Sequence, residues 1–375
     1  MKNIGFIINE VNSFYNHRLG IIAAFVNPET NRLKVLLPVN EKQSKEIELD
    51  QKHLEVEKWG LSRRGINPIA ELKSIFGVSK FLKQDHSTVF LFTIKPVIYG
   101  LLLKPFFNKT KFIAVITGIG SVFLGKSLRN RFLELVVRSL YKFVFKNADR
   151  VVFQNLADRD FFIGSGYISE DKCVLIEGSG VDTDVFKPVG KNKIGTPVKL
   201  LFPSRVIKDK GIVELVDAIK ESGLSRDDVQ LILAGDIDEE NPSRISKSEF
   251  EKMIGGDLRF KWIGYSRSLV KVYQESDLVV LPSYREGLSK SLLEAASCGL
   301  PIVTTDVPGC REVVEDGVNG YLCEPRCKES LRKCILRALN DKNNWDELGR
   351  KGRQRVIDRF SLSSVQKSFL ETMDF

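Results

Sequence analysis

The sequence predicts an α/β protein of two doubly wound domains, each built on a parallel sheet. Short runs rich in Val, Ile and Leu alternate with helical patterns along the chain, which is typical of βαβ units with helices on both faces of a sheet. The length of 375 residues exceeds what a single hydrophobic core usually serves. The hydrophobic content of 43% and the charged content of 28% are those of an ordinary globular protein.

Each candidate strand is a short apolar run that ends in a turn residue. In the first half of the chain these runs are IGFIINE, LKVLLPV, TVFLFTI, KFIAVIT and DRVVFQN. In the second half they are VKLLFPS, VQLILAG, LRFKWIG, DLVVLPS and LPIVTTD. Helical patterns separate the runs of the second half regularly, and parallel strands require such crossover connections.

A stretch dense in Gly, Pro and Lys, residues 178–197, marks the boundary between the halves. We predict one domain over residues 1–185, a second over residues 186–358, and a C-terminal helix over residues 359–375 that packs back on the first domain. Ligands of doubly wound sheets bind at the carboxyl ends of the strands. We therefore expect the two domains to face each other across a cleft that holds the active site.

Positive charge concentrates in one segment. The net charge of the chain is +9, and between Leu101 and Arg150 ten Lys or Arg residues stand against two acids. Aromatic residues are interleaved with them, a composition that suits an anionic membrane surface, and no nucleic-acid motif accompanies it. The N-terminus lacks the long apolar core of a signal peptide, and Lys and Pro interrupt the most apolar segment, residues 89–107. We expect a cytoplasmic protein that docks peripherally on a membrane; the alternative is a solvated face with the aromatic residues in the core.

Metal binding has little support in the sequence. The six cysteines indicate reduced thiols, and the four between residues 310 and 334 match no common zinc spacing. Two Asp-x-Asp pairs, at 182/184 and 236/238, have the pattern with which some enzymes clamp a diphosphate through Mg²⁺ or Mn²⁺. We expect no metal site, because two basic residues described below supply the positive charge.

Two acids mark the most informative stretch, REGLSKSLLEAASCGLP at residues 285–301. A strand ends just before it, Ser289 is placed to cap a helix, and Gly299 is placed to end that helix. The helix N-terminus then lies at the carboxyl end of a strand, where free N–H groups and the helix dipole favour a phosphate. Glu286 just before the helix and Glu294 inside it can accept hydrogen bonds from hydroxyl groups on either side of that phosphate. A nucleotide-sugar has this layout, with a ribose and a transferred sugar flanking a diphosphate.

Two basic residues follow a second strand, in FPSRVIKDKG at residues 202–211. Arg205 leaves the loop after the strand, and Lys210 precedes Gly211 at the start of the next helix. Arginine supplies a planar fork and lysine a compact charge, and both neutralise phosphate oxygens without a metal. We expect Arg205 and Lys210 to stabilise the charge that develops on a departing diphosphate.

On these residues the sequence resembles the retaining glycosyltransferases of family 4, which have the GT-B fold of two Rossmann-like domains facing across a cleft. The resemblance covers the whole chain and is strongest from residue 174 to residue 324. Glu286 and Glu294 meet the family's Glu-x7-Glu motif, and the turn GSGVDTDVF and the runs LAGD and FKWIGY also fit. The N-terminal motifs SFYNHRLG, LSRRGINP and ITGIGSVF are similar to bacterial members that build lipid-linked surface glycans.

The resemblance implies a metal-independent hexosyltransferase that retains the anomeric configuration. It implies transfer of a hexose or N-acetylhexosamine from a UDP-sugar, the donor substrate, to a polyprenyl-diphosphate-linked saccharide in O-antigen, lipopolysaccharide, capsule or protein-glycan synthesis, with no cofactor. The first domain would bind the acceptor at the inner face of the cell membrane, and the second the nucleotide-sugar. The residues implied as catalytic are Glu286, Arg205, Lys210 and His17. The residues implied to bind the donor are Arg205, Lys210, Gly264, Tyr265, Glu286, Gly287, Leu288, Ser289 and Glu294.

Two departures from the family affect the first domain. Many relatives carry paired glycines after the first strand, where this chain has NEVNSFYNH, and a His after the fourth strand, where it has Thr117 and Gly118. His17 is the nearest other histidine, and it either faces the acceptor or lies on the surface. Two other functions stay open. A non-hydrolysing UDP-sugar epimerase of the same architecture needs no acceptor, and a non-catalytic scaffold binds no nucleotide-sugar.

Overall fold

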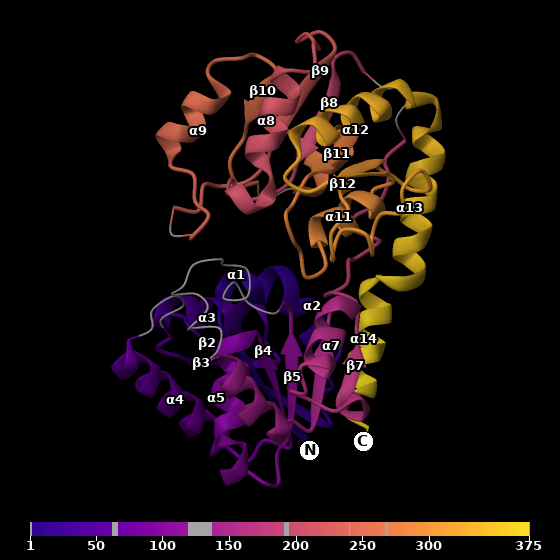
Figure 1. The fold of residues 1–375 in the computed structure, drawn as a ribbon. Helices are drawn as coiled ribbons and strands as arrows, with labels where there is room; N and C mark the ends of the chain where they lie inside the picture. The colour runs from indigo at the N-terminus through magenta and orange to yellow at the C-terminus, as the bar shows by residue number, and fades with distance from the viewer. Residues whose placement is uncertain are drawn as a thin grey trace. The chain divides into compact units, whose positions relative to one another are not determined.

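The computed structural model describes residues 2–61, 67–118, 137–190, 195–239, 241–266 and 269–374. Backbone contacts divide the chain into an N-terminal unit, Met1–Ser179 with Val365–Phe375, and a C-terminal unit, Gly180–Ser364. Each unit contains a parallel sheet with helices around it (Figure 1). The predicted fold class, α/β with two Rossmann-like domains, is thus confirmed.

The division of the chain differs in detail from the boundaries expected at 185/186 and 358/359. Val181 already pairs with the end of the C-terminal unit: its N–H donates to Phe360 O at 3.0 Å, and its carbonyl accepts from Leu362 N at 2.8 Å. The first unit therefore ends at Ser179, and the chain returns to it only from Val365, inside the last helix.

In the described part of the N-terminal unit, seven parallel strands form a sheet in the order β3-β2-β1-β4-β5-β6-β7. The strands are β1 (Lys2–Ile8), β2 (Asn31–Leu37), β3 (Leu54–Lys58), β4 (Thr88–Phe92), β5 (Lys111–Ile116), β6 (Arg150–Phe153) and β7 (Cys173–Leu175). Five of them coincide with predicted runs, and the two edge strands, β3 and β7, do not. Because an edge strand is short or buried on one side only, its apolar signal is weak.

Helices cover both faces of this sheet (Figure 1). The helical segments are α1 (Val11–Ser13), a π-helical turn (Phe14–Arg18), α2 (Leu19–Ala23), α3 (Glu41–Asp50), α4 (Pro68–Leu82), α5 (Ile94–Leu103), α7 (Leu156–Gly164) and α14 (Leu362–Glu371), with short 3₁₀ turns at Lys104–Phe106, Phe145–Asn147 and Glu170–Lys172. Val365 and Phe369 of α14 belong to the core on one face, where the rings of Phe369 and Phe90 lie 6.1 Å apart. The last helix thus completes the core of the N-terminal unit.

In the described part of the C-terminal unit, six parallel strands form a second sheet, in the order β10-β9-β8-β11-β12-β13. The strands are β8 (Val198–Phe202), β9 (Val229–Leu233), β10 (Phe260–Trp262), β11 (Leu278–Leu281), β12 (Ile302–Thr305) and β13 (Tyr321–Cys323). The helices are α8 (Ile212–Lys220), α9 (Lys247–Ile254), α10 (Leu269–Glu275), α11 (Lys290–Ser297), α12 (Lys328–Asn340) and α13 (Trp345–Arg359), with 3₁₀ turns at Lys208–Lys210 and Lys342–Asn344. All but β13, again an edge strand, coincide with predicted runs.

The described part of the basic and aromatic segment, Leu101–Arg150, contributes some of its aromatic residues to the core. Residues 119–136, which include three of the ten basic residues, Lys126, Arg129 and Arg131, lie outside the described chain. The described aromatic residues of the segment that are buried are Phe112, Tyr141 and Phe145, whereas Phe106 and Phe143 are exposed by 80% and 54%. The expectation that the aromatic residues of this segment enter a membrane therefore holds at most for part of it.

Candidate active site

The predicted donor-binding residues lie along the carboxyl edge of the sheet in the C-terminal unit. Arg205 and Lys210 follow β8, and Glu286 follows β11, its neighbour in the sheet. From β8 the chain proceeds to β9 and β10 on one side, and from β11 it proceeds to β12 and β13 on the other. The crevice outside such a reversal of strand order is where doubly wound sheets bind their ligands.

Lys210 and Glu286 form a direct ion pair at this point. Lys210 Nζ lies 2.5 Å from Glu286 Oε1, and Ser283 Oγ donates to the same oxygen at 2.7 Å. The two charged side chains are exposed by 19% and 12%, so solvent screens them weakly. The pair fixes an ammonium group at the carboxyl end of β11. The sequence predicted both residues but neither their pairing nor the contribution of Ser283.

Two glycines allow the loops of this site to approach one another. Gly211 has a φ of +72°, and a Cβ there would lie 2.1 Å from Pro282 O. Gly309 has a φ of +84°, and a Cβ there would lie 2.6 Å from the backbone of Glu286. Ser289 N also donates to Gly309 O at 3.0 Å. Gly309 was not among the predicted site residues, because its local sequence signal is only that of a Pro-Gly turn.

The helix α11 begins beside this pair. Its N-cap is Ser289, as predicted, and Gly299 follows its end with a φ of +72°. The Ser289 hydroxyl makes no capping bond within the described structure, so the first-turn N–H groups are not satisfied by this side chain. Leu288 packs on the hydrophobic core just before the helix, with Gly287 preceding it in the loop. The N-terminus of α11 therefore suits an anion at the same edge as Lys210.

Glu294 lies inside α11 and has a different environment from Glu286. It is 8% exposed, and Tyr273 Oη donates to its Oε2 at 3.1 Å. Burial raises the pKa of Glu294 to about 7, although Lys290 and the Tyr273 hydrogen bond act in the opposite direction. Tyr273 was not predicted as a site residue, because it comes from α10 and its contact with α11 leaves no local pattern.

Arg205, Gly264 and Tyr265 lie farther along the same edge. Arg205 Nη1 is 2.6 Å from Asp238 Oδ2, and the arginine side chain is 47% exposed. Tyr265 N donates to Asp236 Oδ1 at 2.9 Å, and the tyrosine is 64% exposed. The second Asp-x-Asp pair thus binds a guanidinium and a backbone N–H. Within the described ranges, no group of three or more His, Cys, Asp or Glu side chains has a metal-binding arrangement.

His17, the remaining predicted catalytic residue, belongs to the N-terminal unit. It lies in the π-helical turn that follows β1, and its Nδ1 is 3.3 Å from Ser179 Oγ. Both residues are parts of the same unit, so the contact orients the imidazole within that unit. The donor-site residues described above belong to the C-terminal unit.

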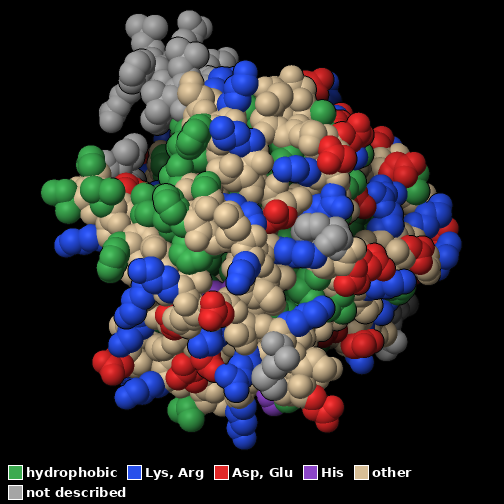
Figure 2. All heavy atoms as spheres, turned by 90° about the horizontal axis from the view of Figure 1, so that it is seen from below, with side chains coloured by type: hydrophobic (Ala, Val, Ile, Leu, Met, Phe, Trp, Pro, Cys, Tyr) green, Lys and Arg blue, Asp and Glu red, His purple; other side chains and the backbone are tan. Residues whose placement is uncertain are grey.

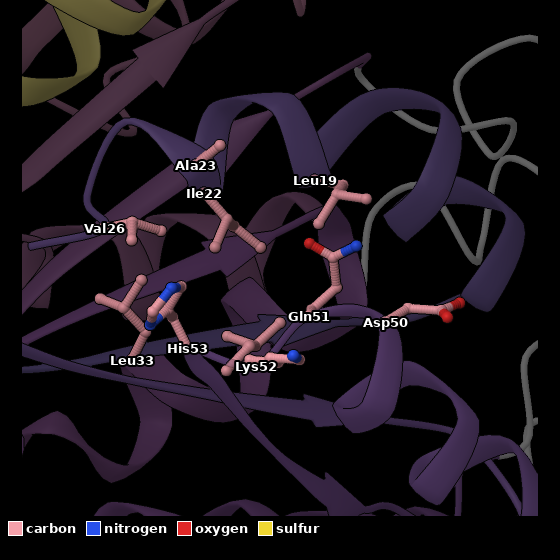
Figure 3. A pocket seen from close by; sticks show the side chains of 10 residues that line it. Leu19, Ile22, Ala23, Val26, Leu33, Asp50, Gln51, Lys52 and His53 are labelled. Carbon is pink, nitrogen blue, oxygen red and sulfur yellow. The ribbon is translucent and has the colours of Figure 1, made fainter. Parts of the chain in front are cut away.

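A separate cavity of about 240 Å³ lies in the N-terminal unit (Figure 3). It is lined by Leu19, Ile22, Ala23, Val26, Leu33, Asp50, Gln51, Lys52, His53 and Leu54. Figure 3 shows the Asp50 carboxylate turned away from the apolar side chains. Leu33 and Leu54 lie near the beginnings of β2 and β3, hence toward the amino edge of the sheet. None of the predicted site residues lines this cavity.

Comparisons with known proteins find similar glycosyltransferases. Residues 186–355 match the model of the family Glycosyl transferases group 1. The chain is 26% identical over 384 aligned residues to an N,N'-diacetylbacillosaminyl-diphospho-undecaprenol alpha-1,3-N-acetylgalactosaminyltransferase of Campylobacter jejuni, covering 99% of this chain and 98% of that protein. It is 24% identical over 313 residues to a UDP-Gal:alpha-D-GlcNAc-diphosphoundecaprenol alpha-1,3-galactosyltransferase of Escherichia coli, covering 80% and 78%.

Solved structures agree on the fold. A sucrose-phosphate synthase from Thermosynechococcus elongatus superimposes with a TM-score of 0.81 at 18% identity, covering 100% of this chain and 98% of that one. The Anabaena protein HepE, solved in complex with UDP, superimposes with a TM-score of 0.77 at 20% identity and covers 100% of both chains. The chain therefore has the GT-B fold, and its residues 186–355 are similar to the glycosyl transferases group 1 family.

Proposed function

We propose that the chain transfers a hexose or N-acetylhexosamine from a UDP-sugar to a polyprenyl-diphosphate-linked saccharide, without a metal and with retention of anomeric configuration. The main structural support for UDP-sugar as the donor is the Lys210–Glu286 ion pair beside the N-terminus of α11. The acceptor class rests on the names of the Campylobacter jejuni and Escherichia coli relatives, both transferases onto diphospho-undecaprenol saccharides. Those names favour transfer over the alternative of epimerisation.

In this proposal the donor diphosphate lies at the N-terminus of α11. As the bond between sugar and phosphate breaks, negative charge develops on the diphosphate, and the Lys210 ammonium and the Arg205 guanidinium stabilise that charge. Glu286 holds Lys210 in place and accepts from a hydroxyl of the transferred sugar. Glu294 accepts from the ribose hydroxyls, and the backbone at Gly264 and Tyr265 receives the base. Because side chains supply all the positive charge in this scheme, a metal is not required.

A transfer assay tests the proposal directly. The full chain is incubated in EDTA with a panel of UDP-sugars and a short-chain polyprenyl-diphosphate saccharide, and the products are examined by mass spectrometry and NMR. We expect one UDP-sugar to add one sugar to the acceptor, with the anomeric configuration of the donor retained. An inverted linkage would contradict the stereochemistry, and activity that returns only with Mn²⁺ would contradict metal independence. Interconversion of the donor without acceptor would support the epimerase instead.

We also propose that the N-terminal unit docks on the inner face of the cell membrane, where a polyprenyl acceptor is anchored. The residues Ile69, Leu72 and Phe76 form a stripe along α4 and are exposed by 66%, 66% and 72%. The exposed Lys73 and Lys80 lie on the same helix, which makes the surface suited to anionic lipid. Figure 2 shows hydrophobic side chains gathered at its left, the side on which Figure 1 draws α4, with Lys and Arg side chains beside them. In the described part of the chain, no helix is long and apolar enough to cross a bilayer.

Vesicle co-sedimentation tests this docking. Phe76→Ser is expected to lower partitioning onto phosphatidylglycerol vesicles about tenfold or more, since burial of a Phe side chain is worth roughly 1.5–3 kcal/mol. Replacing Lys73 and Lys80 with Glu should remove the preference for anionic over neutral vesicles, because each lysine contributes about 1 kcal/mol at such a surface. Leu258→Ser is the matched control, as this side chain is 67% exposed in the C-terminal unit. Equal binding of the Phe76 and Leu258 variants would exclude α4 as the docking surface.

A further inference from the structure

A buried arginine, Arg18, lies in the N-terminal unit. Arg18 is 4% exposed, and within the described chain its Nε and Nη1 have no acceptor. Its Cζ lies 4.8 Å from the centre of the Phe92 ring, which attracts the charge but does not satisfy the N–H groups. Burial lowers the pKa of Arg18 to about 10, and the group stays charged at neutral pH. A buried cation with unused donors calls for an anion from outside the described chain.

The arginine lies at the carboxyl ends of two neighbouring strands. Phe92 is the last residue of β4 and pairs in register with Ile8, the last residue of β1. The residues that follow them, Thr93 and Asn9, each carry a buried oxygen without a partner in the described chain, Thr93 Oγ1 and Asn9 Oδ1. Three unsatisfied polar side chains therefore gather at one edge of the sheet, which is the edge that binds ligands in this class of fold.

The backbone at Thr93 has an unusual conformation. Its φ of +74° and ψ of 171° are rare for a residue with a side chain, and such strain is found preferentially where ligands bind. Thr93 is also the N-cap of α5, a helix of ten residues, and its side chain makes no capping bond. The third residue of α5 is Pro96, which has no N–H, so the N–H of Ile94 joins the Thr93 hydroxyl and the Arg18 guanidinium as a donor without an acceptor inside the helix.

We propose that Arg18, Thr93 and the first turn of α5 form a phosphate subsite, and that it takes the diphosphate of the lipid-linked acceptor. This assignment of the ligand rests on the proposed function. The donor set suits phosphate, since a guanidinium fork and a helix N-terminus both bind its oxygens. Asn9 Oδ1, which accepts, then receives a hydroxyl of the sugar next to that diphosphate. Arg18 also ends the π-helical turn that carries His17, so the subsite lies next to that residue in the chain.

The kinetic test compares two acceptors with the same saccharide, one on a short polyprenyl diphosphate and one on a neutral alkyl group. In Arg18→Met the KM for the diphosphate acceptor should rise about 10- to 150-fold, as expected for lost charged hydrogen bonds, while the KM for the neutral acceptor and the Kd for UDP stay unchanged. The KM of Arg18→Lys for the diphosphate acceptor should lie between those of the wild type and Arg18→Met, because lysine keeps the positive charge but lacks the two parallel N–H donors of the guanidinium. Equal KM changes for both acceptors would overturn the assignment.

Thermal unfolding separates a binding role from a structural one. Without ligand, Arg18→Met should melt no lower than the wild type, because it removes a buried charge that lacks a partner; Thr93→Gly should melt higher, because glycine adopts a positive φ without strain. A Tm several degrees lower for Arg18→Met would mean that the residue is structural and would overturn the subsite.

Inorganic pyrophosphate distinguishes failure of the subsite from failure of the proposed function. Pyrophosphate should raise the Tm of Lys210→Met, in which the donor site is impaired, and should not raise that of the double variant Arg18→Met/Lys210→Met. A shift that persists in the double variant overturns the subsite. A second outcome is that pyrophosphate does not raise the Tm of the double variant and that the wild type glycosylates no acceptor. In that case Arg18 binds free phosphate compounds, and the assignment of the acceptor diphosphate to this subsite is overturned.

Discussion

The variant Glu286→Gln is expected to keep its UDP affinity within about threefold while its kcat falls about 100- to 1000-fold, the usual effect of losing one positioned polar group at a reacting centre. The amide accepts more weakly from the Lys210 ammonium and from a sugar hydroxyl. The loss of its charge leaves Lys210 available to the diphosphate, so binding in the ground state survives. Titration calorimetry with UDP and initial rates on the proposed acceptor measure the two quantities.

The matched control is Glu312→Gln, a second carboxylate in the adjoining loop. Glu312 Oε2 accepts from Gly309 N at 2.6 Å, and a glutamine oxygen can do the same. Its kcat should therefore fall less than about tenfold. The Glu286 assignment is wrong if both variants lose kcat equally, or if Glu286→Gln loses UDP affinity in proportion to kcat.

The second large effect concerns the pH dependence of donor binding through Glu294. Because the pKa of this buried carboxyl is about 7, it takes up a proton as the pH falls below 7 and loses its capacity to accept from the ribose. The Kd for UDP should then rise about tenfold for each pH unit below 7 and stay level above pH 8. Glu294→Gln should bind UDP about 10- to 150-fold more weakly than the wild type at pH 8, with no pH dependence of this origin.

The stability of the free protein should follow the opposite trend. Folding raises the pKa of Glu294 from its ordinary value near 4.5 to about 7, so the folded state binds more protons between these pH values. The contribution of the neutral carboxyl to stability is fully present below pH 4.5 and is lost as the pH rises to 7. Glu294→Gln should therefore melt higher than the wild type at pH 8 and close to it at pH 4.5. A UDP affinity of the wild type that does not vary between pH 5.5 and 8 would contradict the binding expectation, and an equal Tm of the wild type and Glu294→Gln at pH 8 would contradict the stability expectation.

Tyr273→Phe provides a control that leaves the carboxyl in place. The hydrogen bond from Tyr273 Oη lowers the pKa of Glu294, so its loss should move the midpoint of the UDP pH profile upward. The affinity at pH 9 should remain near that of the wild type.

The sequence predicted the central strands of both sheets and the edge strand β10, and missed the edge strands β3, β7 and β13. Central strands such as β1 and β4 are buried on both faces, which leaves continuous apolar runs such as those ending at Ile8 and Phe92. In contrast, β3 alternates the buried Leu54 and Val56 with charged residues. A short strand with one buried side resembles a loop in sequence, so its position depends on a neighbour that is distant in the chain.

The candidate site shows the same limit. Glu286, Glu294 and Lys210 follow from local patterns of strand, loop and helix, and the structure places them on the expected elements. The residues that surround them come from other elements of the fold. Tyr273, on another helix, donates a hydrogen bond to Glu294. Gly309, in the loop after another strand, has no Cβ that would clash with the backbone of Glu286. Burial likewise leaves two Arg18 nitrogens without an acceptor in the described chain, and burial has no local signature in the sequence.

A crystal structure of the full chain with UDP tests the central claim most directly. We predict the diphosphate between Lys210 Nζ and the first turn of α11, with the Glu294 carboxylate accepting from the ribose hydroxyls. The base should then lie against the backbone at Gly264 and Tyr265. UDP bound away from the carboxyl edge of the C-terminal sheet, or a ribose that does not contact Glu294, would contradict the assignment of this site.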